Sequence, residues 1–341
     1  MKNENKYKKM NLHSNKEREN RIEIIRAFAI ITVVLGHSII LYAKEFDAYQ
    51  PQQTSTFFAC AKRFINLYQM PLFFSVSGYL FAKSAGKESA VSFFLKKAKR
   101  ILLPFLLVGL FWMIPIKLFA QYPPYAGCSI KGTVVMFLLG TDPGHLWFLP
   151  VLFLYFVISY CFVRLFRNKS AVWALAFLAG LGCSILEPSP SKMPFNSYYP
   201  LYFMRYFWSF PFGALMFWLK KHIDCAAGKP LLKLMTALGC TAVACTAVFA
   251  EEKLSLLASV IIVFSTYFLA PEKNSVLAKI ISKNSFGLYL FHSPLIYLTF
   301  RYALNYSPAA VFSINLLIWG SLSFLLTSLL RKTPLKVAIG E

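Results

Sequence analysis

Two ionisable side chains inside the first apolar segment have the spacing needed for proton-transfer chemistry. Arg26 and His37 are eleven residues apart. In a helix this spacing puts both side chains on one face, with a rise of about 16 Å between them. An ionisable group in hydrocarbon costs roughly 2.5–3.5 kcal/mol and therefore marks a functional site. The pattern predicts a charged entrance at Arg26 that leads to His37, whose neutral imidazole could take a proton from a hydroxyl near pH 7.

Neighbouring residues extend this interpretation and leave a structural alternative open. Glu23 precedes Arg26 by about one helical turn and could pair with it, and Gly36 lets another backbone or a ligand approach His37 closely. Because no acidic residue lies in the middle of a predicted span, the group that orients His37 should be a hydroxyl or an amide. Four such side chains occur on the second apolar segment: Asn66, Gln69, Ser75 and Ser77. Alternatively, His37 is a neutral core histidine and Arg26 extends to the membrane interface.

A tight basic cluster precedes the third apolar segment. Lys96, Lys97, Lys99 and Arg100 occur within five residues. Such clusters usually anchor a helix end at the cytoplasmic surface. The functional interpretation is a phosphate site, in which Arg26 and this cluster face a polyphosphate co-substrate from the cytoplasm.

Aromatic and charged residues at two other helix ends, and a histidine inside a third segment, suggest an acceptor site. His145 and Trp147 open one apolar segment, and Tyr202 and Arg205 lie near the start of another. Tyrosine and tryptophan at these places commonly form an interfacial belt, but flat rings with a guanidinium also suit a sugar or another polyhydroxyl compound. His292 lies about 12 Å into a later segment and either assists His37 or makes a polar packing contact beside Pro294.

The elements that must position these residues are membrane helices. We predict an all-α, polytopic membrane protein with about ten spans, each near the ~20 residues needed to cross ~30 Å of hydrocarbon. The segment 133–140 is too short and is predicted to be re-entrant or interfacial. The ten spans are Ile24–Tyr42, Phe64–Phe81, Ile101–Ala120, Leu146–Phe166, Ala171–Leu186, Tyr199–Leu219, Leu231–Ala250, Leu254–Leu269, Ser285–Leu304 and Ala309–Leu330.

Composition and charge support this fold class. Apolar residues make up 57% of the 341 residues and charged residues only 15%, which excludes a disordered chain and argues against an ordinary soluble enzyme. The net charge of +22 would suggest a nucleic-acid partner in a soluble protein. Here 26 of the 36 basic residues fall in the segments that the ten spans place on the same side as the N-terminus, and seven fall in the segments on the opposite side. This bias predicts that both termini are cytoplasmic and that the partner is a lipid bilayer rather than nucleic acid.

The seven cysteines do not form a metal or disulfide pattern. No Cys-x-x-Cys or Cys/His ligand spacing occurs, so the sequence predicts no metal site. Cys60 and Cys128 are expected on the same outer side of the membrane, where they could pair, although we do not expect them to.

The motifs together resemble acyltransferase family 3, the integral-membrane O-acyltransferases of bacterial surface polysaccharides, and especially its members that acetylate the enterobacterial common antigen. The resemblance extends through nearly the whole chain. Its matched pieces, in order, are Glu23, Arg26 and His37; Met70-Pro-Leu-Phe-Phe with Ser77-Gly78-Tyr79; the basic cluster ending in Arg100 and Pro104; His145-Leu-Trp147-Phe; and Ser285-Phe-Gly-Leu-Tyr289 with His292.

The resemblance implies acyl transfer from cytoplasmic acyl-CoA, most often acetyl-CoA, to a hydroxyl on the outer side. His37 matches the essential histidine of the family, and Arg26 matches the arginine before it. Lys97 and Arg100 fall where many members have an Arg-x-x-Arg pair, so we expect both to bind acyl-CoA. Lys97 supplies a point charge where arginine would supply a two-pronged fork.

We therefore expect an O-acyltransferase of the bacterial inner membrane that modifies a surface polysaccharide or a lipid-linked glycan. His37 acts as a general base or carries the acyl group, and His145, Trp147, Tyr202, Arg205 and His292 contact the acceptor. The expected division is a flexible basic cytoplasmic leader (1–20), a membrane domain (21–332) and a short cytoplasmic tail (333–341). The alternatives are a transporter of a sugar or lipid-linked glycan unit and a non-catalytic subunit of a glycan assembly complex. The acyl group, the acceptor and the oligomeric state stay open.

Overall fold

The computed structural model describes residues 2–43, 48–49, 51, 53–84, 88–166, 169–186, 196–227, 229–248 and 252–341. Helices make up nearly all of this part of the chain, which contains no strand. In order they are α1 (Lys2–Ser38), η1 (Ile40–Tyr42), α2 (Thr56–Asn66), α3 (Gln69–Ser84), α4 (Ala90–Lys97), η2 (Ala98–Leu102), α5 (Leu103–Val108), η3 (Gly109–Met113), α6 (Ile114–Phe119), η4 (Pro123–Tyr125), α7 (Ile130–Leu139), η5 (Gly144–Trp147), α8 (Phe148–Leu165), α9 (Lys169–Ile185), α10 (Tyr198–Tyr206), α11 (Ser209–Ala227), α12 (Pro230–Val248), α13 (Glu252–Leu269), α14 (Val276–Tyr302), α15 (Pro308–Ser313), η8 (Ile314–Trp319), α16 (Gly320–Leu330) and η9 (Pro334–Ile339). The all-α prediction is confirmed.

In the part of the chain that the structure describes, three stretches are long and apolar enough to cross a membrane: Ala90–Phe119, Ile130–Leu165 and Pro308–Leu330. They overlap three of the ten predicted spans. Large apolar side chains such as Phe111 and Leu325 are exposed on them, as expected for helices whose solvent is hydrocarbon. The other seven predicted spans also fall on helices. The number of crossings, the membrane side of each terminus and the three-part division of the chain stay predictions.

Two predicted spans are each divided into two helices. The apolar run at 64–81 is interrupted at Leu67 and Tyr68, between α2 and α3. The run at 199–219 is interrupted at Phe207 and Trp208, between α10 and α11. The residues at both interruptions are apolar or aromatic, so the hydropathy of the sequence does not reveal either interruption.

Serine side chains cap the N-termini of several of these helices. Ser55 Oγ accepts a hydrogen bond from the backbone N–H of Phe58 at the start of α2, and Ser129 Oγ accepts one from Gly132 at the start of α7. Each bond satisfies one of the donors that a helix N-terminus leaves without a partner. Helix α7 ends at Gly140, whose φ of 78° is the left-handed conformation that glycine adopts readily. The predicted short segment 133–140 is therefore a helix with its own beginning and end.

Helices α3 and α11 approach so closely that their backbones touch. A Cβ atom on Gly78 would overlap the carbonyl oxygen of Phe210, and one on Gly213 would overlap that of Ser75. Only glycine fits at either position, as in other membrane helix pairs with small interfacial residues. The two helices therefore form a rigid unit in the middle of the fold.

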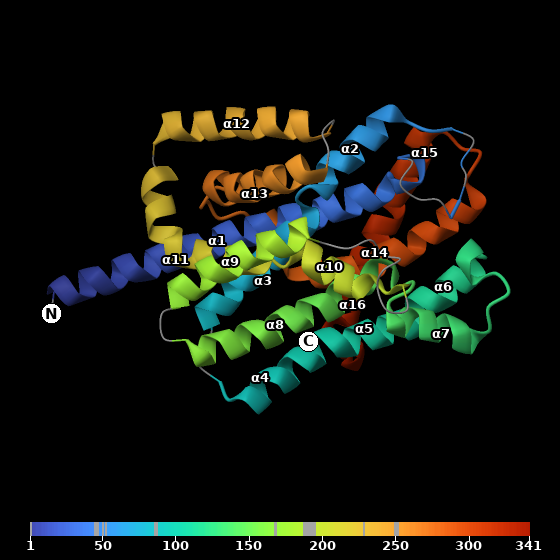
Figure 1. Cartoon of the computed structure of the whole chain (residues 1–341), viewed down its shortest axis with the longest axis horizontal. Coiled ribbons are helices and arrows are strands. Elements are labelled where there is room, and N and C mark those ends of the chain that lie inside the picture. Colours follow the sequence, from blue (N-terminus) through green and yellow to red (C-terminus); the bar gives the residue numbers. More distant parts are fainter. Residues whose placement is uncertain are drawn as a thin grey trace.

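Helix α1 runs along the length of the molecule and packs mainly against α14 and α3 (Figure 1). Helices α12 and α13 lie side by side along one edge, whereas α4, α5 and α8 lie along the opposite edge (Figure 1). Helices α1 and α14 each carry a histidine that the sequence predicts to be in the site, so their packing can bring these two residues together.

Candidate active site

His37 lies one residue before the end of α1, with its ring turned toward α14. Its Nδ1 atom is 2.9 Å from the carbonyl oxygen of Val33, one turn earlier. A carbonyl oxygen only accepts hydrogen bonds, so Nδ1 carries the proton and Nε2 keeps the basic lone pair. The predicted orienting hydroxyl or amide is replaced by this backbone carbonyl. Ser75 and Ser77 instead donate to carbonyls of their own helix, at Leu72 and Phe73.

His292, from α14, packs against His37. The two ring centroids are 4.9 Å apart and the rings meet edge to face. Nδ1 of His292 donates to the carbonyl oxygens of Leu288 and Tyr289, at 2.8 and 3.0 Å. Its Nε2 is buried and has no hydrogen-bond partner, and the residue is only 1% exposed.

His145, from η5, extends the group to three imidazoles, which we call the histidine cluster. Its ring centroid is 5.6 Å from that of His292. Nε2 donates to the carbonyl oxygen of Leu290 at 3.1 Å, and the Tyr289 hydroxyl donates to the backbone carbonyl of His145. This arrangement leaves Nδ1 of His145 buried without a partner. Unsatisfied buried polar atoms are rare in native structures, and two in one cluster indicate a place for a hydroxyl-bearing ligand or water.

Helix α2 brings a further charged residue, Lys62, to the histidine cluster. Lys62 is only 4% exposed and acts electrostatically on both His37 and His292. Gln69 lies beside it, with Oε1 buried and Nε2 donating to Asn66 Oδ1 at 2.7 Å. Lys62 precedes the predicted span Phe64–Phe81 and is not among the predicted site residues. The spacing of Lys62, Asn66 and Gln69, at i, i+4 and i+7, is the signal that could have placed them on one face.

The predicted basic entrance is partly assembled at the other end of the α1 span. Arg26 is half-buried, and the charged groups that act on it are Glu23 and Arg100. Arg100 is exposed in the π-helical turn η2. The structure therefore brings Arg26 and Arg100 within electrostatic range of each other. One carboxylate oxygen of Glu23 is buried and has no hydrogen-bond partner.

Lys97 has a different environment from Arg100. Its ammonium lies 3.7 Å from the centroid of the Phe156 ring and 5.5 Å from that of Phe93. A cation over aromatic faces is stabilised by the ring quadrupoles and is drawn away from water. Lys97 therefore sits against the aromatic core between α4 and α8, still close enough to Arg100 for their charges to interact.

The predicted acceptor residues form an aromatic stack beside the histidine cluster. The Trp147 and Tyr202 ring centroids are 4.1 Å apart, and Tyr206 lies parallel to Trp147 at 5.4 Å. Arg205 belongs to the same helix, α10, as the two tyrosines. Phe148 and Tyr289 connect the stack to the cluster. The Phe148 ring lies 6.4 Å from Trp147 and 5.4 Å from Tyr289, and the Tyr289 ring lies 5.4 Å from that of His145.

A comparison with known families decides the class of this protein. A family model described as an acyltransferase domain, that of acyltransferase family 3, matches residues 19–330. The chain belongs to acyltransferase family 3. No curated protein and no solved structure matches it significantly. Together with its apolar helices, the family identifies a membrane acyltransferase.

In this family 3 acyltransferase the motif residues quoted from the sequence meet in space. His37, His145 and His292 come from α1, η5 and α14, yet their rings form one contiguous group. Trp147 and Tyr202 are in contact as well. The roles assigned to these residues, and to Arg26, Lys97, Arg100 and Arg205, stay predictions.

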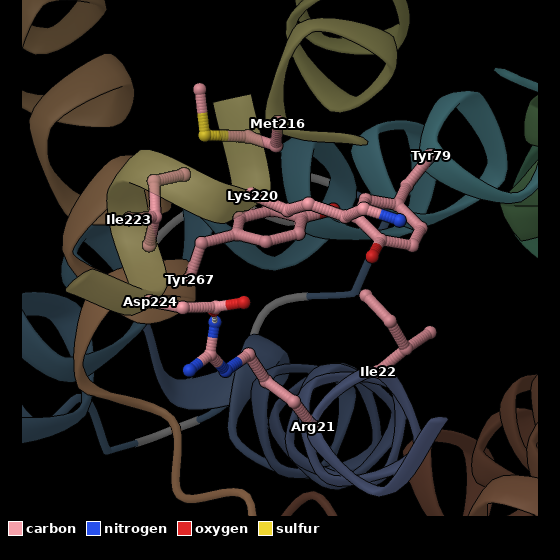
Figure 2. A pocket seen from close by; sticks show the side chains of 8 residues that line it. All are labelled: Arg21, Ile22, Tyr79, Met216, Lys220, Ile223, Asp224 and Tyr267. Carbon is pink, nitrogen blue, oxygen red and sulfur yellow. Dashed lines mark hydrogen bonds and ion pairs between the residues drawn. The ribbon is translucent and has the colours of Figure 1, made fainter. Parts of the chain in front are cut away.

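A separate small cavity lies between α1, α3, α11 and α13 (Figure 2). Arg21 projects into it and donates to Asp224 Oδ1 at 2.6 Å, while its other terminal nitrogen pairs with Glu272. Tyr79 and Tyr267 cover the cavity from the opposite side (Figure 2). None of the predicted site residues lines this cavity, so we assign it no part in acyl transfer.

The described residues contain no cluster of three or more His, Cys, Asp or Glu side chains that could hold a metal ion. Cys60 and Cys128 are both free thiols.

Proposed function

We propose that this acyltransferase moves an acyl group, most simply acetyl, from cytoplasmic acyl-CoA to a hydroxyl of a surface glycan or its lipid-linked precursor on the outer side of the bacterial inner membrane. The observation that carries the proposal is the state of His37. Its Nδ1–H donates to the Val33 carbonyl oxygen, which leaves Nε2 as a base. Beside it, His292 Nε2 and His145 Nδ1 are buried and receive no hydrogen bond. A hydroxyl is the kind of group that such a cluster lacks.

The donor half of the proposal rests on Arg26 and Arg100. Guanidinium groups bind phosphates through paired, charge-assisted hydrogen bonds. Arg26 and His37 are eleven positions apart on α1, a rise of about 16 Å, along which the pantetheine arm would extend. Lys97 adds positive charge behind Arg100 from its place against Phe156.

The proposed transfer step uses His37 as a general base. His37 Nε2 takes the proton of the acceptor hydroxyl as the hydroxyl oxygen attacks the thioester carbonyl carbon. The new C–O bond forms and the C–S bond breaks. The proton then passes from the imidazolium to the leaving thiolate, which releases CoA as the free thiol.

The acceptor half rests on the stack of Trp147, Tyr202 and Tyr206. Large flat rings offer apolar contact to the C–H face of a sugar ring, and the Arg205 guanidinium supplies donors for its hydroxyls. The stack reaches the histidine cluster through Phe148 and Tyr289, which would bring a bound sugar to His37.

The test is acyl transfer by His37→Ala in parallel with His222→Ala, an exposed histidine on α11. Purified protein would receive radiolabelled acetyl-CoA and envelope glycan from cells lacking the protein. We expect His37→Ala to lower kcat about 10²–10⁴-fold, the usual contribution of a general base, and His222→Ala to match the native protein. Full transfer by His37→Ala at equal protein level would refute the proposal, as would the absence of transfer by the native protein.

A further inference from the structure

Lys62 is a buried cation that the proposed transfer step does not yet use. It lies on α2 with 4% of its surface exposed, whereas the adjacent Arg63 is exposed. Lysine is seldom buried to this extent, and ionisable groups within membrane proteins usually serve function.

The approach of α2 to α1 at Gly36 fixes the position of the Lys62 ammonium. A Cβ atom on Gly36 would lie 3.4 Å from Lys62 Nζ, and 3.1 Å from both Gln69 Oε1 and the Ile65 side chain. The absence of a side chain at Gly36 therefore lets Lys62 lie beside the residue that precedes His37. The ammonium stands at the end of α1, next to the proposed base.

The electrostatic surroundings of His37 favour an anion. Among the described residues, the titratable groups that act on His37 are His292 from α14, Lys62 from α2 and His145 from η5. Each of these groups is neutral or positive. A site built only to hold a positively charged imidazolium would place a carboxylate there, as in the Ser-His-Asp triad. A positive site instead complements negative charge that appears during the reaction.

The proposed transfer step creates such a charge. When the acceptor oxygen attacks the thioester, the carbonyl π electrons move onto the carbonyl oxygen, which becomes an oxyanion. When the C–S bond breaks, the carbonyl re-forms and the electron pair leaves on sulfur. We propose that Lys62 is a catalytic residue whose ammonium donates a hydrogen bond to this oxyanion. This inference rests on the proposed function and adds to it the residue that stabilises the intermediate.

The experiment compares four forms of the full-length protein in detergent, supplied with acetyl-CoA and the same envelope glycan. Lys62→Met keeps most of the apolar stem and removes the charge, Lys62→Arg keeps the charge, and Arg63→Met is the matched neighbour. We expect Lys62→Met to lower kcat about 10²–10³-fold, as for the loss of an oxyanion donor, with KM for acetyl-CoA within about twofold of the native value. Lys62→Arg should recover much of kcat, and Arg63→Met should equal the native protein.

Separate outcomes identify which idea fails. A Lys62→Met protein that keeps its kcat, or that changes only KM, would overturn the role of Lys62 while His37→Ala, assayed beside it, still tests the general base. Lack of transfer by the native protein would overturn both. If Lys62→Met does not fold, as judged by its unfolding midpoint, Lys62→Gln takes its place. The kcat of that variant, and the binding of CoA itself, then decide the question.

Discussion

Helix α1 carries two buried polar clusters that differ in how completely they are satisfied. At one end, the guanidinium of Arg21 is bonded to the carboxylates of Asp224 and Glu272. At the other end, His37 belongs to a cluster with His292 and His145, in which His292 Nε2 and His145 Nδ1 are buried and have no hydrogen-bond partner. We call the first cluster closed because both terminal nitrogens of the guanidinium have carboxylate partners, although Arg21 Nε has none, and it holds α1 against α11 and the segment before α14. The second is open, which is the property expected of a site that receives a substrate.

A second closed cluster adjoins the open one. Lys117 is fully buried, its Nζ lies 2.9–3.0 Å from both carboxylate oxygens of Asp142, and the Tyr122 ring covers it at 4.3 Å. Asp142 belongs to the short turn between α7 and η5, which carries His145. The paired charges therefore fix the turn from which one member of the histidine cluster projects.

The largest expected change in stability follows from breaking this second closed cluster. Lys117→Met leaves the Asp142 carboxylate without its buried partner, and we expect the free energy of unfolding to fall by about 3–5 kcal/mol. Lys131→Met, at an exposed position on α7, is the control and should have little effect. The double variant Lys117→Met/Asp142→Leu should recover much of the loss, because no charge is then left buried. Denaturant titration in detergent measures all three, and a fully stable single variant would contradict the prediction.

A smaller loss of stability is expected at the Arg21 cluster. Asp224 and Glu272 keep 25% and 38% of their side-chain surfaces exposed, so water can partly solvate them once Arg21 is gone. We expect Arg21→Gln to lower the free energy of unfolding by about 1–3 kcal/mol, less than for a fully buried pair. Lys229→Gln, an exposed change near the end of α11, serves as control. If Arg21 were part of the reaction rather than the framework, kcat per folded molecule would fall too, and we expect it not to.

The smallest change in stability is expected at the open cluster itself. His292→Leu removes Nε2, which has no partner, together with the Nδ1–H that donates to the carbonyl oxygens of Leu288 and Tyr289, so the free energy of unfolding should change by no more than about 1 kcal/mol. Acyl transfer should nevertheless fall about 10- to 100-fold, because the acceptor hydroxyl loses one of the groups that position it beside His37. Unfolding and transfer are measured on the same preparation. A large loss of stability together with unchanged transfer would show that His292 is a packing residue.

The sequence predicted well those features that depend on one helix. Arg26 and His37 share a face of α1 by periodicity alone, and the structure places one near Arg100 and the other against His292. Each of the ten apolar runs falls on helix where the structure describes it, but the runs could not show the interruption at Leu67 and Tyr68, because hydrophobicity continues across it.

Features that depend on contacts between helices could not be predicted from the sequence. Lys62 could not be recognised as buried until α2 was seen to pack against Gly36. The choice of a backbone carbonyl as the partner of His37 likewise follows from the rotamer of the ring, which one sequence does not reveal. The predicted role of Lys97 in binding acyl-CoA beside Arg100 stays a prediction, but its position over the Phe156 ring could not be predicted, because it depends on how α4 meets α8.

The paired glycines of α3 and α11 restrict how this enzyme can move. With Gly78 against the backbone of Phe210 and Gly213 against that of Ser75, neither helix can slide along the other by a residue without a collision between main-chain atoms. We therefore expect α3 and α11 to move together as one rigid unit during catalysis. In the proposed reaction, we therefore expect the displacement that admits donor and acceptor to occur elsewhere, at the boundary of α1 with α14 and α2, where His37, His292 and Lys62 lie.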